Sequence, residues 1–187
     1  MAKYSYVKAL AKFSDQQNWY TDIHDYIFSS YECPYLFCGL LASTSPRMSV
    51  KKSWNLSVEL YDRIMEGQTD FDWKFFGMLP AQYMNVERLL RGEKLSGPKV
   101  TAFFANLIGD YDQVTIDTWM IVFFKFDKCL TKNRYKMLAD RIRNYAKKVG
   151  MTPAGLQAVL WSWIRDEHNK SHSSYIKSAE ITIMEGN

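Results

Sequence analysis

Lys99 and Asp117 are the two side chains of this 187-residue sequence whose types and spacing best suit chemistry. Each lies near the expected start of an apolar helix, and 18 residues separate position 99 from position 117. A neutral amine is a nucleophile that can form a Schiff base, and a carboxylate stabilises positive charge that develops beside it.

Two helices joined by a polar loop are expected to position the pair. Gly97-Pro98 predicts a turn followed by a helix start, and Gly109 ends that helix. Thr115 or Asp117 begins a second helix, from Trp119 to Phe126. Apolar side chains recur at helical spacing in the first of these helices: Val100, Phe103, Phe104, Leu107 and Ile108. Residues 95–120 are therefore predicted to form a hairpin that carries the candidate active site.

This stretch resembles the helix-hairpin-helix DNA glycosylases, and most of all their endonuclease III and 8-oxoguanine glycosylase branch. Gly97-Pro98-Lys99 and Thr115-Ile116-Asp117-Thr118 fill the slots of the family's Gly-x-Lys and Val-Asp-Thr motifs. Upstream, residues 40–52 are similar to a family segment, Leu-Ser-x-Gln-Thr-x-x-x-Ser-Val-x-Lys, that lies beside the DNA. The resemblance covers residues 36–165.

The resemblance implies a DNA glycosylase with β-lyase activity that flips out a modified base, with Lys99 as nucleophile and Asp117 as the activating carboxylate. Base excision repair, or removal of modified bases from phage DNA as an antiviral defence, would be its role. The implied partner is double-stranded DNA containing a modified base, bound by a monomer that needs no metal and no cofactor. The implied DNA-binding residues are Thr44, Ser45, Arg47, Lys51, Lys52, Leu95 and Gly97.

A third group of candidate residues lies near the end of the sequence. Gln157, Trp161 and Arg165 are spaced four residues apart, so they share one face of a helix. Gln and Trp side chains can bond to and stack on a flipped base, which predicts that this stripe lines a base pocket. Packing of Gln157 and Trp161, with Arg165 at the surface, is the structural alternative.

Each catalytic candidate also has a structural alternative. Lys99 could contact a phosphate or be an exposed helix lysine, and Asp117 could cap the following helix. For the whole chain three other functions stay open. They are a non-catalytic helix-hairpin-helix DNA-binding protein, a monofunctional glycosylase in which Asp117 activates water, and a structural or protein-interaction domain.

The positive charge is concentrated in one region of the sequence. The net charge is only +4, but residues 125–148 contain nine Lys or Arg and two acids, Asp127 and Asp140. This region is predicted to face phosphates, and the alternative is a solvated helix face.

Periodicity predicts an all-α fold. The resemblance implies a single helical glycosylase-like domain over residues 1–187. The tail, residues 168–187, is expected to form a short strand or to be disordered. Three scattered cysteines and the lack of a run of ~20 apolar residues favour a cytoplasmic protein without disulfides or a membrane span. The expected helices cover residues 22–28, 34–42, 50–65, 81–90, 98–108, 119–126, 133–149 and 154–167.

Overall fold

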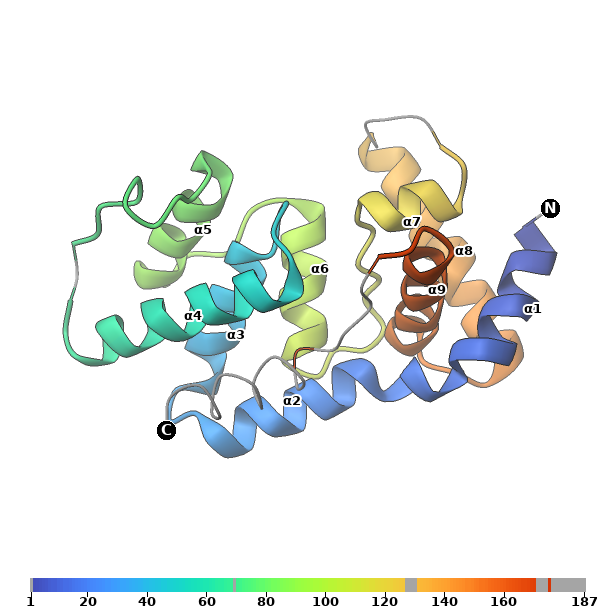
Figure 1. Ribbon diagram of the computed structural model, residues 1–187, viewed down its shortest axis with the longest axis horizontal. Coiled ribbons are helices and arrows are strands. Elements are labelled where there is room, and N and C mark those ends of the chain that lie inside the picture. The colour runs from blue at the N-terminus through green and yellow to red at the C-terminus, as the bar shows by residue number, and fades with distance from the viewer. Residues whose placement is uncertain (1, 69, 127–130, 171–174, 176–187) are drawn as a thin grey trace. The chain divides into compact units, whose positions relative to one another are not determined.

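The computed structural model describes residues 2–68, 70–126, 131–170 and 175 (Figure 1). These described residues form α-helices and one 3-10 helix, joined by turns and loops, and they contain no strand. The prediction of an all-α fold is therefore confirmed. The chain divides into two compact units, Met1–Asp22 with Ala105–His172 (unit 1) and Ile23–Phe104 with Ser173–Asn187 (unit 2).

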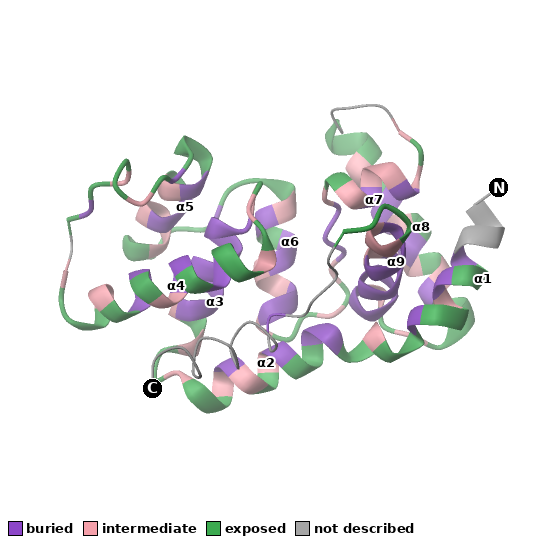
Figure 2. Cartoon of the chain, in the orientation of Figure 1, coloured by how far each residue is buried: buried purple, intermediate pink, exposed green. Residues whose placement is uncertain are grey.

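Unit 1 is built around its last helix, which is buried along most of its length (Figure 2). This helix, α9, contacts α1, η1, α7 and α8. The core includes Leu156, Val159 and Leu160 from α9 and Leu138 and Ile142 from α8. The helices of unit 1 are α1 (Ala2–Phe13), η1 (Ser14–Asn18), the start of α2 (Trp19–Ser30), α7 (Thr118–Phe123), α8 (Lys132–Val149) and α9 (Pro153–Glu167).

The first helix is a feature that the sequence reasoning missed, because no helix was expected before residue 22. In α1, Tyr6, Ala9 and Phe13 are buried in the core of unit 1. Their spacing of three and four residues places them on one face of a helix. The signal was present in the sequence, but Val7, Leu10 and Ala11 lie between these positions, so apolar residues on several sides of the helix obscured the periodicity.

Unit 2 contains the rest of α2, α3 (Pro34–Thr44), α4 (Val50–Met65), α5 (Pro80–Leu90) and the first part of α6 (Pro98–Leu107). Its core holds stacked and edge-to-face aromatic rings: Tyr31 lies 3.8 Å from Phe37 between ring centroids, and Phe37 lies 4.9 Å from Trp54. The helix α3 packs on both α4 and α5. A Cβ atom at Gly39 would lie 2.6 Å from the Leu89 methyl groups, so glycine permits the close packing of α3 on α5.

Most helices begin and end close to the predicted residues, because capping residues near each end fix these positions. Ser49, Thr131 and Thr152 accept a hydrogen bond at the N-termini of α4, α8 and α9, and Gly150 ends α8 in the left-handed conformation. Two ends differ by three residues: α2 begins at Trp19 rather than at residue 22, and α7 ends at Phe123 rather than Phe126, where Lys125 adopts a φ of 56°. Most of the predicted tail, residues 171–174 and 176–187, lies outside the described residues.

Candidate functional site

Asp117, the predicted catalytic carboxylate, is partly buried and holds the start of α7. One of its oxygens, Oδ1, accepts a hydrogen bond of 3.0 Å from the backbone N–H of Met120. The other, Oδ2, accepts one of 2.9 Å from the indole Nε1–H of Trp161 on α9. Asp117 is therefore an N-cap, as its structural alternative stated, and it also joins α7 to α9.

Beside Asp117 lies a surface cluster of two tryptophans and one arginine, Trp119, Trp161 and Arg165, which we call the tryptophan–arginine cluster. All three side chains are partly exposed. The guanidinium carbon of Arg165 lies 5.2 Å from the ring centroid of Trp119 and 4.6 Å from that of Trp161, within cation–π range of both. Burial lowers the pKa of Arg165, and the nearby carboxylate of Asp117 acts in the opposite direction.

The structure separates the three residues that were predicted to line a base pocket. Trp161 and Arg165 lie together next to Asp117. Gln157 does not, because it is 3% exposed and its Oε1 accepts a hydrogen bond of 2.8 Å from the Tyr20 hydroxyl. Trp119 was not among the predicted site residues. Its position two residues after Asp117 could have indicated that it lies near that carboxylate.

The segment that leads to Asp117 is fixed along α8. The Tyr135 hydroxyl donates to the carbonyl oxygen of Val114 at 2.8 Å and accepts from the N–H of Ile116 at 3.1 Å. Nearer the end of α8, Arg143 donates to the carbonyl oxygen of Asp112 at 2.9 Å. The first half of α8 therefore lies beside the residues directly before Asp117.

The exposed surface of α8 is strongly basic. Its 18 residues include seven Lys or Arg and a single acid, Asp140. Arg143 forms an ion pair of 2.9 Å with Asp140, which leaves six basic residues on the helix. These six are all exposed and form no ion pair with a described residue: Lys132, Arg134, Lys136, Arg141, Lys147 and Lys148. We call them the α8 basic face.

Lys99, the predicted nucleophile, lies in the first turn of α6 in unit 2. Its Nζ lies 3.4 Å from the carbonyl oxygen of Ser45 and 3.5 Å from the Ser45 hydroxyl. Asp117 belongs to unit 1, so neither unit by itself contains the predicted catalytic pair. Each side chain has partners within its own unit.

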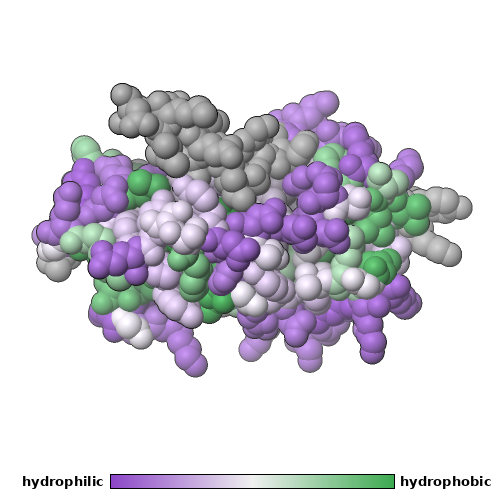
Figure 3. Space-filling view, turned by 90° about the horizontal axis from the view of Figure 1, so that it is seen from below, coloured by the Kyte–Doolittle hydropathy of each residue, from purple (hydrophilic) through white to green (hydrophobic). Residues whose placement is uncertain are grey.

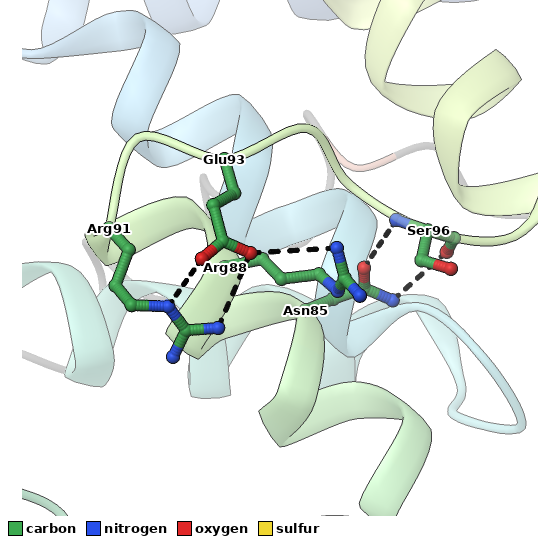
Figure 4. A network of polar contacts seen from close by, with 5 residues as sticks. All are labelled: Asn85, Arg88, Arg91, Glu93 and Ser96. Atoms are coloured by element: carbon green, nitrogen blue, oxygen red, sulfur yellow. Dashed lines mark hydrogen bonds and ion pairs between the residues drawn. The ribbon is translucent and has the colours of Figure 1, made fainter.

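The turn before Lys99 is held by α5 (Figure 4). Asn85 accepts a hydrogen bond of 2.6 Å from the N–H of Ser96 and donates one of 3.1 Å to the Ser96 carbonyl oxygen. Glu93 pairs with Arg91 at 2.7 Å and with Arg88 at 3.5 Å, which fixes the same segment to the end of α5. Gly97 comes directly after this anchored turn and has a φ of 96°. Glycine adopts such a positive φ without steric cost because it has no Cβ atom.

The remaining predicted DNA-binding residues fall into a buried and an exposed set. Thr44 is fully buried and bonds to Ser53 and Ser57 at 2.9 Å, and Ser45 and Leu95 are also buried. These three side chains belong to the interior of unit 2, where they support the fold. The residues at the other predicted positions are exposed: Arg47, Lys51, Lys52 and Gly97.

The helical fold and these contacts define an all-α protein that carries a basic helix face and a cation–aromatic cluster in one compact unit. The chain belongs to the DUF7178 family, a family of unknown function whose model matches residues 5–168. No curated protein and no solved structure matches the chain.

This membership corrects the family resemblance drawn from the sequence. The matching model covers all of residues 36–165, on which the resemblance to helix-hairpin-helix DNA glycosylases rested, and it assigns them to DUF7178. The short motifs around Lys99 and Asp117 were too few to fix a family. The roles that the resemblance gave to these residues therefore need support of their own.

The outer surface of the described helices gives one further finding. Hydrophilic side chains are spread over the face seen in Figure 3, with smaller apolar areas between them. Among the residues that the structure describes, no helix combines the length and apolar character needed to cross a membrane.

Proposed function

We propose that this chain binds DNA and that the α8 basic face contacts the phosphates. The observation that carries the proposal is the charge of α8, where six exposed basic side chains have no acidic partner among the described residues. Lys and Arg side chains neutralise phosphates and release counterions, which gives sequence-independent affinity.

The periodicity of α8 makes these charges available together. Leu138, Ile142 and Ala146, four residues apart, are buried and mark the side of α8 that packs in unit 1. The six basic side chains of the α8 basic face occupy the remaining sides. At 1.5 Å per residue the helix is about 27 Å long. This length corresponds to about eight phosphates along one strand, at about 3.4 Å per phosphate.

The test measures DNA affinity as a function of salt concentration. If all six residues contact phosphates, log K should fall against log salt with a slope of about −5. Replacing Lys132, Lys136, Lys147 and Lys148 with Gln leaves two contacts and should reduce the slope to about −2. Circular dichroism of this variant checks that α8 is intact.

A control variant removes the same charge from unit 2, with Lys51, Lys52, Lys74 and Lys94 all exposed and all replaced by Gln. It should bind DNA with the wild-type slope. Loss of binding in the control alone would move the site to the surface around Lys51 and Lys52 and overturn the proposal. Wild-type protein that shows no salt-sensitive binding would overturn it as well and would favour a protein-interaction domain.

Excision of a modified base by Lys99 and Asp117 is a separate prediction that DNA binding does not require. Borohydride reduction in the presence of abasic DNA should trap a covalent adduct that Lys99→Ala abolishes, if the lysine is a nucleophile. Base release that survives Lys99→Ala but not Asp117→Asn would indicate a carboxylate that activates water. Salt-sensitive binding with neither adduct nor released base would show that the protein binds DNA without excising bases.

A further inference from the structure

The tryptophan–arginine cluster is not explained by phosphate binding, because phosphates do not stack on aromatic rings. We infer that this cluster stacks an unpaired nucleobase, so that the protein prefers single-stranded DNA over duplex of the same length. This inference rests on the proposed DNA binding and names the form of DNA that it takes.

The geometry of the cluster suits a planar aromatic ligand. Trp161 is fixed by the hydrogen bond from its Nε1 to Asp117, and Arg165 lies over the rings of both Trp161 and Trp119. The Trp161 ring is therefore ordered before a ligand binds, which lowers the entropic cost of binding. Trp119 contacts Arg165 and the ring of His168, whose centroid lies 5.7 Å away. Both indoles keep part of their surface in solvent. Every base has a π face that can stack on such a ring, and Arg adds a cation–π contribution.

The need for an unpaired base follows from the structure of the duplex. In a double helix each base is covered above and below by its neighbours, so its faces are not available to a protein side chain. Single strands leave their bases free to stack on aromatic residues.

The cluster and the α8 basic face can act on the same strand because they belong to one unit. Tyr135 on α8 bonds to the backbone at Val114 and Ile116, and Asp117 follows directly. Lys132 lies one helical turn before Tyr135, on the same side of α8, and is exposed. A strand with a base on the cluster would therefore have its neighbouring phosphates near the start of the α8 basic face.

The test compares single-stranded and duplex oligonucleotides of equal length at one salt concentration. Trp119→Ala should weaken single-strand binding on the order of tenfold, because base stacking on an aromatic side chain is lost. Its duplex affinity and its salt slope should stay as in the wild type. Trp119→Phe keeps a ring and should recover most of the lost affinity, which separates stacking from a general effect on folding.

The matched control is Trp73→Ala, which removes a partly exposed tryptophan from unit 2, where its ring stacks with those of Phe71 and Tyr83. It should bind both forms of DNA as the wild type does. Equal affinities of wild type and Trp119→Ala for single strands, or a wild-type preference for duplex, would overturn the inference. If the α8 variant lost binding and Trp119→Ala did not, the proposed DNA binding would stand and the base-stacking inference would be wrong. If the wild type bound no DNA, the proposed function and the inference would both be wrong.

Discussion

Asp117 is expected to contribute to the stability of unit 1 through two separable hydrogen bonds. Replacing it with Ala removes the N-cap of α7, which costs about 1 kcal/mol. It also removes the acceptor for Trp161, a charge-assisted bond at a partly exposed site that we place at about 1 kcal/mol. The total of about 2 kcal/mol corresponds to a fall in Tm of roughly 4–8 °C for a chain of this size.

Asn at the same position separates the two contributions. It caps helices about as well as Asp, so Asp117→Asn should keep the bond to Met120 and lose the bond from Trp161. We therefore expect about half of the destabilisation caused by Ala. Trp161→Phe removes the same bond from the other side and keeps an aromatic ring.

Thermal or urea unfolding of the single and double variants measures the coupling. Asp117→Asn and Trp161→Phe should be less than additive by about 1 kcal/mol, because both remove one bond. Full additivity of the two changes would refute the conclusion that this bond joins α7 to α9. Equal losses for Asn and Ala would refute the capping role. The same variants also show whether a lost activity of Asp117→Asn reflects chemistry or folding.

Three further outcomes follow from buried groups. Gly155→Ala should destabilise unit 1 by about 1–3 kcal/mol in urea unfolding, because its Cβ would lie 2.6 Å from the backbone oxygen of Gln17; wild-type stability would contradict this close approach. Burial raises the pKa of Tyr6 and of Tyr135 to about 12 from an ordinary value of 10.0. Their neutral forms favour the folded state, so stability should be complete below pH 10 and fall as the pH rises toward 12. Ultraviolet titration should show these phenols ionising after the exposed ones, and a single transition near pH 10 would contradict the assignment. Burial raises the pKa of the Cys38 thiol to about 12. In a chain whose other two cysteines are serine, Ellman's reagent should therefore react at pH 8 only after unfolding.

The sequence by itself determined most of the helices and the position of the positive charge, although the reasoning from it missed α1. Capping residues such as Ser49, Thr131 and Thr152 act within a few residues of their own position, so their effect can be predicted without tertiary contacts. The basic character of α8 is likewise a property of local composition.

Only the tertiary structure decided which polar side chains are buried and which meet. Thr44 was predicted to bind DNA and Gln157 to line a base pocket, but both are interior. Ser53, Ser57 and Tyr20 supply their hydrogen-bond partners. A polar group can be buried when a partner is present, and that partner comes from elsewhere in the chain. For the same reason the bond between Asp117 and Trp161, 44 residues apart, could not be read from spacing. The sequence placed a carboxylate at a helix start, and the packing of α7 on α9 set it beside two indole rings.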